Sequence, residues 1–291
     1  MDSVLALQPG AAAPLPFPAD TDAMFADHKG TYRKGIEKRQ RKLAAKVAFI
    51  GQFLQPKERV LFVTTACSPF TTLEQLTTGW VIFYLKRAML VVTDQRILHV
   101  LTNGSFKYRD SIAEIRYADC ASMTQSFSSL TLKYGNGKKE RFLYIARPER
   151  RKLKELLKLK AAASTSAGGG ARTHLCPRCT KPLKADHYRC GSCNLEFKSR
   201  DEGRRLAFIW PGGGYFYTGH WFLGIGDAVA ELVLLIFLIL AIVGAANGAE
   251  GGWVTVGLVA FLLAVEKAIS VYHTDHFIKE YLPAEKVTPL R

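Results

Sequence analysis

Two long apolar runs near the C-terminus constrain this chain more than any other feature of its sequence. Leu232–Ala249 has no charged residue, and Trp253–Tyr272 has only one acidic and one basic residue. If the first run is extended back to Ala228, each can cross about 30 Å of hydrocarbon as a helix that rises about 1.5 Å per residue. The rest of the chain is too short to bury both helices, so the sequence predicts a transmembrane α-hairpin with helices at 227–247 and 252–273.

Basic residues on either side of these runs predict the orientation of the hairpin. They are Arg204 and Arg205 before it and Lys279, Lys286 and Arg291 after it, whereas the connecting loop has none. Short segments rich in Lys and Arg stay on the cytosolic side of the membrane. We therefore predict that both termini are cytosolic and that 274–291 is a cytosolic tail.

A glycine-rich aromatic segment at 199–226 precedes the hairpin. Its part from Leu206 to Gly226 has no acidic residue, Lys or Arg, so a third span must be considered, but Pro211 and six glycines disfavour a straight helix. A third crossing would also move the basic tail outside. We predict an interfacial or re-entrant segment with aromatic residues at headgroup level, namely Trp210, Tyr215, Phe216, Tyr217 and Trp221. Pro211–His220 resembles the Gly-rich, Tyr-x-Gly opening of a family of small two-helix membrane modules, which implies the same hairpin topology.

Four ionisable residues fall within the predicted spans. Asp227 and Glu231 are one helical turn apart, and Glu266 and Lys267 lie at a similar depth in the second helix. We predict that Glu231 and Lys267 form a neutralising pair inside the hairpin, the alternative being that all four snorkel to the interface. The hairpin also offers a surface for homo-oligomer formation.

The strongest local motif is a pair of Cys-x-x-Cys knuckles. Cys176 and Cys179 are followed after ten residues by Cys190 and Cys193, a spacing that suits one tetrahedral ion held by four thiolates. The motif at 175–198 resembles the zinc-ribbon family and implies a structural Zn²⁺ without an open coordination position. A rubredoxin-like iron site is the alternative. We expect Gly191 to supply a positive φ in the second knuckle and His174 and His187 to be surface residues.

Short apolar segments separated by turn residues fill the region at 55–160. Seven segments predict strands of a curved sheet or barrel, and Pro148–Lys160 predicts a closing amphipathic helix. The segments are RVLFVTTAC, WVIFYL, RAMLVVT, RILHVLT, SIAEIRYADC, SSLTLKY and RFLYIA.

This region resembles the bacterial pleckstrin-homology-like (PH-like) family. The resemblance rests on Leu90–Leu98, which is similar to the family's T-(D/N)-x-R-(I/L) step, and on Ser111–Ile115. It implies a module that binds a ligand or partner and has no catalytic residues. The whole chain is then a multidomain α+β protein with a PH-like sheet, a zinc ribbon and a transmembrane α-hairpin, located in a bacterial inner membrane.

Three segments complete the domain organisation. We predict a disordered Ala/Pro-rich leader at 1–23, a basic amphipathic helix at 24–54 and a flexible linker at 161–174. The helix either lies on anionic lipid or packs on the sheet with its charged face in solvent. Its basic surface, for lipid or nucleic acid, comprises Arg33, Lys34, Lys38, Arg39, Arg41, Lys42 and Lys46.

The net charge of +15 indicates a polyanionic neighbour, either anionic membrane lipids or nucleic acid. We find no nucleophile–base arrangement or phosphate-binding loop, and expect His273 and His276 to be interface residues and the protein not to be an enzyme. The sequence favours a membrane-tethered adaptor that binds an unidentified protein or lipid. A membrane-anchored nucleic-acid-binding regulator is the alternative.

Overall fold

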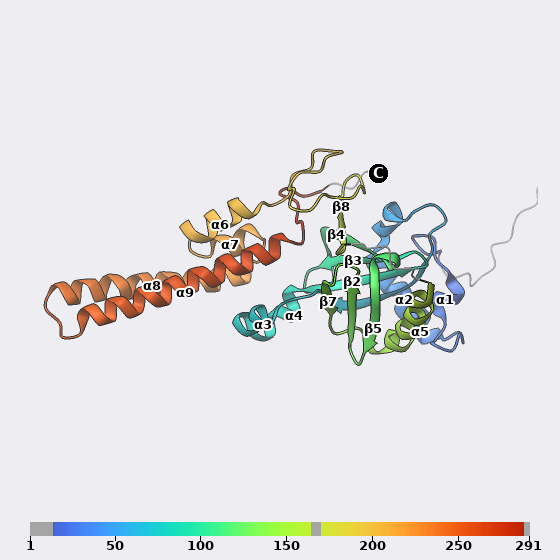
Figure 1. Ribbon diagram of the computed structural model, residues 1–291, viewed down its shortest axis with the longest axis horizontal. Helices are drawn as coiled ribbons and strands as arrows, with labels where there is room; N and C mark the ends of the chain where they lie inside the picture. Colours follow the sequence, from blue (N-terminus) through green and yellow to red (C-terminus); the bar gives the residue numbers. More distant parts are fainter. Residues whose placement is uncertain (1–13, 164–169, 288–291) are drawn as a thin grey trace, which may run out of the picture.

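The computed structural model of the chain describes residues 14–163 and 170–287. It shows a mixed α+β structure with two antiparallel sheets and two long apolar helices at the C-terminus (Figure 1). Part of the predicted leader (1–13), the centre of the predicted linker (164–169) and the end of the tail (288–291) lie outside the described residues.

One sheet has five strands in the order β1-β2-β3-β4-β8, and the other has three in the order β5-β6-β7. The strands are β1 Val60–Cys67, β2 Arg87–Thr93, β3 Arg96–Thr102, β4 Tyr108–Arg116, β5 Cys120–Ser126, β6 Ser129–Tyr134, β7 Lys139–Phe142 and β8 Thr173–Leu175. Successive side chains of the large sheet enter two different cores. Met89 and Val91 face the N-terminal helices, while Leu90 and Val92 face the small sheet and helix α5 (Arg147–Ala163). Both faces are covered, which explains why β2 and β3 are apolar almost throughout.

The N-terminal segment covers one face of the large sheet. The elements are α1 Thr21–Phe25, α2 Lys34–Lys46 and the 3₁₀ helix η1 Ala48–Phe53. The prediction of one helix over 24–54 was wrong, because Val47, Ile50 and Phe53 are all buried at the three-residue spacing of a 3₁₀ turn. The leader prediction also fails in its described part, since Phe17 is buried and Asp20 caps α1.

The connection between β1 and β2 is helical. It comprises α3 Thr72–Thr78, η2 Gly79–Val81 and α4 Ile82–Leu85. We refer to residues 71–85 as the β1–β2 insertion. The predicted strand over Trp80–Leu85 is therefore wrong. Thr71 and Glu74 form a reciprocal capping box, which starts a helix before the apolar run and carries it away from the sheet. A short 3₁₀ turn, η3 Tyr117–Asp119, separates β4 from β5.

The C-terminal part is a helical assembly that extends away from the sheets (Figure 1). It contains α6 Arg200–Ile209, α7 Gly213–Tyr217, α8 Trp221–Ala246 and α9 Gly252–Ile278. Both α8 and α9 are long and apolar enough to cross a membrane. Residues 199–220 fold back as two short helices at the base of the hairpin, whereas 221–226 are the first residues of α8, so the predicted start of that helix at 227 was too late. Gly214 permits this contact, because a Cβ there would lie 2.0 Å from Thr274 Oγ1 of α9.

Neither the predicted linker nor the predicted tail is free along its described length. Thr173 and His174 form β8 and pair with Glu114 and Ala113 of β4. After α9 the chain returns to the cysteine region, where Phe197 and Pro283 form a bridge. The amide of Lys198 donates to Leu282 O at 2.9 Å. The cysteine region is therefore held between the large sheet and the segment that follows α9.

Candidate metal centre and its junction with the hairpin

The two cysteine knuckles have matching backbone geometry. The amide of Thr180 donates to Cys176 O at 2.9 Å, and that of Asn194 donates to Cys190 O at 3.0 Å. Each of these two residues, which follow the second cysteine of a knuckle, has a positive φ of 61° or 57°. Gly191 does not have a positive φ, so our expectation for it was wrong. The left-handed residue closes each turn instead of lying inside it.

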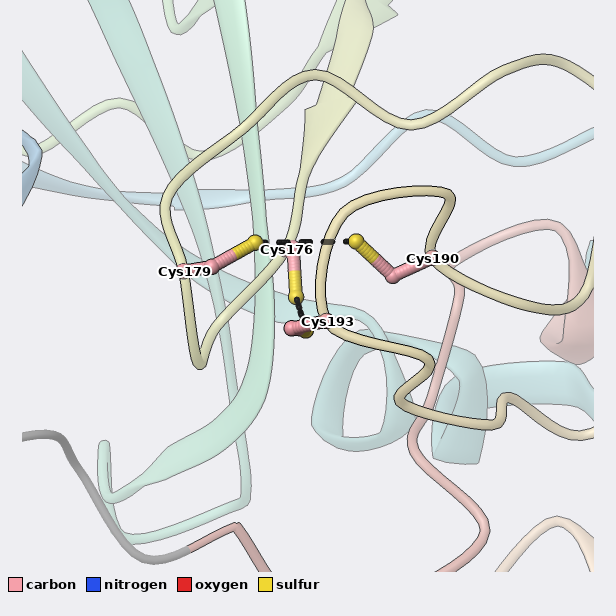
Figure 2. A group of neighbouring side chains, drawn as sticks. All are labelled: Cys176, Cys179, Cys190 and Cys193. Atoms are coloured by element: carbon pink, nitrogen blue, oxygen red, sulfur yellow. Dashed lines mark hydrogen bonds between the residues drawn. The ribbon is translucent and has the colours of Figure 1, made fainter.

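The four cysteine sulfurs form a compact cluster (Figure 2). Cys176 Sγ lies 3.5 Å from Cys193 Sγ, and Cys179 Sγ lies 3.6 Å from Cys190 Sγ. All four sulfurs are within 4.8 Å of one another. A tetrahedral ion with metal–sulfur bonds of about 2.3 Å needs sulfur–sulfur separations of about 3.8 Å. The cluster therefore fits a four-thiolate metal ion.

Backbone amides support the charge that such ligands must carry. The amides of Arg178 and Cys179 donate to the Cys176 sulfur, and those of Ser192 and Cys193 donate to the Cys190 sulfur. Hydrogen bonds to a thiolate favour its ionised form, which is the form that binds metal. Bound there, an ion would hold both knuckles together, and four protein ligands would leave no position for a reacting water.

Residues 175–198 around the four cysteines, which we call the ribbon, have a small core that the chain beyond α9 completes. Leu183, Leu195 and Phe197 pack with Tyr281 around the cysteines. The Tyr281 hydroxyl accepts a hydrogen bond from the Asp186 amide at 2.7 Å. The segment after α9 is thus a structural part of the ribbon.

A buried polar cluster connects sheet, ribbon and hairpin. Arg172 Nη2 donates to Glu280 Oε1 at 3.0 Å, and Arg172 Nε lies 3.4 Å from Glu140 Oε1 of β7. Arg172 Nη1 donates to His99 Nδ1 of β3 at 2.9 Å. The other ring nitrogen of His99 must then carry the proton, and it lies 2.8 Å from Ser68 Oγ. We call Arg172, Glu280, Glu140 and His99 the junction cluster.

Electrostatics in the junction cluster keep Arg172 and Glu280 charged and His99 neutral. Burial, helped by the nearby Arg172 charge, lowers the pKa of His99 to about 3. Burial alone would raise the pKa of Glu280, but Arg172 outweighs it and holds that pKa well below its usual range. His174 is mostly buried beside Glu280, with 11% of its side chain exposed, so its predicted surface position was wrong; His187 is exposed.

Helix α9 contacts the β1–β2 insertion near its C-terminal end. His273 Nε2 lies 2.7 Å from Thr77 Oγ1 of α3, and His273 Nδ1 lies 2.5 Å from the Tyr215 hydroxyl of α7. One imidazole therefore connects the insertion, α7 and α9. His276 instead hydrogen-bonds the Tyr272 carbonyl of its own helix, so the two imidazoles do not converge on a common ligand.

Polar residues also meet between the two long apolar helices α8 and α9. Lys267 Nζ lies 2.6 Å from Glu231 Oε2 and donates to Ala207 O of α6 at 3.0 Å. Ser270 Oγ donates to Asp227 Oδ2 at 3.2 Å. Carboxylate oxygens of Asp227, Glu231 and Glu266 lie within 4.8 Å of one another. The Lys267–Glu231 pair therefore places one cation beside three carboxylates at the level of α6.

The predicted basic surface is divided by its contacts. Arg33, Arg39 and Arg41 pair with Asp27, Glu149 and Glu37, and Lys46 donates to Ser105 O at 3.0 Å. Lys34, Lys38 and Lys42 are exposed. The Arg39–Glu149 contact joins α2 to α5, and Figure 1 places both helices at the end of the molecule away from the hairpin. Helix α2 therefore packs on the sheet, where Gln40 bonds the Val63 backbone, and its exposed lysines lie on the other face.

Comparisons with known proteins give no family for this chain. No family model and no curated protein matches it. Among solved structures, it is similar to the C-terminal domain of an unknown protein from Leishmania infantum, at 13% identity. The alignment covers 44% of this chain and 98% of that chain, with a TM-score of 0.27. A similarity this low says nothing about function.

Proposed function

We propose that the protein is a non-enzymatic adaptor anchored in a bacterial cytoplasmic membrane, with a PH-like domain that presents a basic surface to an acidic protein. The observation that carries this proposal is the placement of two opposite surfaces on one connected body. The bare apolar hairpin lies at one end, and the basic helices α2 and α5 lie at the other (Figure 1). Such a body holds a binding surface at a fixed distance from a bilayer.

The order of elements supports a PH-like domain. Seven antiparallel strands in two sheets are followed by α5, whose Leu153 and Leu157 pack into the core with Leu130 and Phe142. That arrangement matches the strands-then-helix order that the resemblance implies. The domain would act by binding, with no catalytic groups of its own.

Zinc is the ion we propose for the ribbon. Four thiolates at tetrahedral spacing are a ligand set that zinc prefers, and zinc has no redox chemistry to disturb a structural site. The ion would fix the ribbon, and the ribbon would fix the contact between β8 and the segment after α9. Its role is thus to keep the sheet domain in register with the hairpin.

The basic surface favours a soluble acidic partner over the bilayer that holds the hairpin. Exposed cations of α2 and α5 are Lys34, Lys38, Lys42, Lys46, Arg147, Arg151, Lys154 and Lys158. We call them the distal basic face. Anionic lipid headgroups would instead meet exposed basic residues near the hairpin base, such as Arg205.

Nucleic acid is the second candidate partner, because the same face would attract any polyanion. Helices α2 and α5 have no aromatic residue. Binding of single strands commonly relies on base stacking against aromatic side chains. Their absence from these helices favours the acidic protein.

The test uses the full chain in nanodiscs of neutral lipid. Lys38→Glu, Lys42→Glu and Lys154→Glu together are expected to abolish binding of an acidic peptide, whereas Lys181→Glu with Lys184→Glu in the ribbon leaves it intact. Binding of duplex DNA or RNA, measured beside it across a salt series, decides between the candidates. Nucleic acid that displaces the peptide at physiological salt would favour the regulator over the adaptor.

A further inference from the structure

The β1–β2 insertion presents an apolar surface without an exposed charge. Leu76 and Trp80 are 80% and 79% exposed, and Leu73 and Tyr84 are also exposed. Across residues 71–85 the only charged residue is Glu74. Its carboxylate is buried and lies 3.1 Å from Lys86 Nζ.

Polar contacts bind the other side of the insertion to helix α9. The Thr71 hydroxyl lies 2.7 Å from the Tyr272 hydroxyl, and Thr77 reaches His273 at the same distance. The Lys86 ammonium lies 5.1 Å from the centre of the Phe277 ring. The insertion therefore has a polar side that faces α9 and an apolar side turned outward.

The contacts of His273 show at which level of α9 the insertion lies. Its two ring nitrogens contact Thr77 of the insertion and Tyr215 of α7, so these elements lie at the same level of α9. Near that level the surface of the helical assembly carries the Arg204–Asp275 ion pair, together with exposed apolar and aromatic residues. They include Phe208, Trp210, Trp221 and Phe222. Figure 1 shows α6 and α7 on one side of the hairpin base and α3 on the other.

We propose that the β1–β2 insertion is an additional membrane contact beside the α8–α9 hairpin. Its residues Leu73, Leu76, Trp80 and Tyr84 are then buried at the boundary between lipid headgroups and acyl chains. Trp and Tyr favour this boundary because each combines an apolar ring with a polar group. The insertion contacts α9 at the hairpin base, where α8 and α9 also expose apolar side chains, and a bilayer around the hairpin is therefore the occupant that we propose for its apolar side. A membrane contact beside the hairpin would prevent the sheet domain from rocking about α9.

The inference rests on the hairpin being in a bilayer, and the experiment separates the two. The full chain with Trp210→Phe, Trp221→Phe and Trp253→Phe keeps Trp80 alone and is reconstituted in vesicles of brominated phosphatidylcholine. Bromine near the headgroup end of the acyl chains is expected to quench Trp80, and aqueous acrylamide is expected to quench it weakly. Trp80 that acrylamide quenches freely and bromine does not would overturn the proposal, as would protection from both, which indicates a protein contact.

Two matched variants complete the test. One keeps Trp253, at the start of α9, as the single tryptophan, and it must be quenched by brominated lipid if the hairpin is inserted. In the other, all four native tryptophans are changed to Phe and Leu159→Trp is added on α5; residue 159 is 74% exposed, and α5 lies at the end of the molecule away from the hairpin. It is expected to be quenched by acrylamide alone. Quenched Trp253 with unquenched Trp80 refutes only the insertion contact, whereas two unquenched residues refute membrane anchoring itself.

Discussion

The large sheet and the α8–α9 hairpin are built from similar apolar residues, yet they differ in what covers them. Every described residue of β3 is buried, by the N-terminal helices on one side and the small sheet on the other. Ile236, Phe237, Ile239 and Leu240 of α8 are instead 56–60% exposed. The chain therefore buries its own large sheet, whereas the apolar side chains of the hairpin remain exposed to whatever surrounds the protein.

The difference between these regions shows what connects them. Besides the short polypeptide between α5 and the ribbon, a buried ion pair between Arg172 and Glu280 joins the sheet region to the segment that follows the hairpin. Breaking that pair, removing the metal or changing the solvent should therefore affect the two regions differently. Four predictions test this contrast, in order of decreasing effect.

Removal of a metal ligand should have the largest effect. Cys190→Ser leaves three thiolates and is expected to abolish metal binding, which contributes about 10–16 kcal/mol in small zinc domains. The ribbon core around Leu195 and Tyr281 should then lose its order. Metal content by mass spectrometry provides the measurement. Cys120→Ser, at a buried cysteine outside the cluster, should retain the metal; equal loss in both variants would contradict the site.

Disruption of the junction cluster should rank second. Arg172→Ala leaves Glu280 and Glu140 buried without their cation, and the expected loss is about 3–5 kcal/mol in the free energy of unfolding. Urea denaturation in micelles, followed by circular dichroism, measures this loss. The double variant with Glu280→Ala should be destabilised by less than the sum of the two single changes.

The control for that experiment is a pair whose cation lies at the surface, while its buried carboxylate, Glu114, keeps a second cation in Arg96. Arg116 contacts Glu114 at 2.7 Å but has 55% of its side chain exposed. Arg116→Ala should therefore change the free energy of unfolding by at most about 1 kcal/mol. A loss as large as that of Arg172→Ala would show that burial does not decide the strength of these contacts.

A charge introduced at an exposed apolar residue tests whether α8 contacts lipid and α5 contacts water. Ile239→Arg in the middle of α8 should disfavour membrane insertion by about 2.5–3.5 kcal/mol and increase the fraction extracted by alkaline carbonate. Leu159→Arg on α5 replaces an even more exposed apolar residue and should leave extraction unchanged. If both variants behave alike, exposure of α8 does not reflect contact with lipid.

The features that the sequence predicted well depend on residues close together in the chain. Two knuckles of three-residue spacing bring the cysteines together, and the length of the apolar runs is enough to predict helices that can span a membrane. Alternation at a period of two predicted β6 and β7. Such patterns require no knowledge of distant contacts.

Other features depended on partners that no local pattern reveals. Arg172 and Glu280 are 108 residues apart, and nothing near either one predicts their contact. The insertion is different, because Thr71 and Glu74 are a capping-box pattern that was visible in the sequence but outweighed by the strand-like run after it. Thr180 and Asn194 adopt the positive φ that glycine would favour, and the cysteine spacing alone did not reveal that these positions, and not Gly191, would take it.

The smallest predicted effect is a pH dependence that arises at His99. The groups that face its ring are Arg172, Glu280, His174 and Lys86, and burial is the main reason that its pKa falls to about 3 from an unfolded value of 6.5. Between these values the unfolded chain binds a proton that the folded chain does not. Stability from His99 is therefore complete above about pH 6.5 and decreases as the pH falls, by up to about 1.4 kcal/mol per pH unit.

His99→Gln should flatten this dependence, because an amide can accept from Arg172 and bond Ser68 without titrating. Unfolding free energies at pH 7.0 and at about pH 5.5 measure the slope. Glu280 acts in the same direction, but its contribution is lost only below its unfolded pKa of 4.5, so the two are separable by pH. An unchanged slope in His99→Gln would assign the acid sensitivity to other groups. A flattened slope, with membrane extraction unaltered, would locate the acid sensitivity in the large sheet and not in the hairpin.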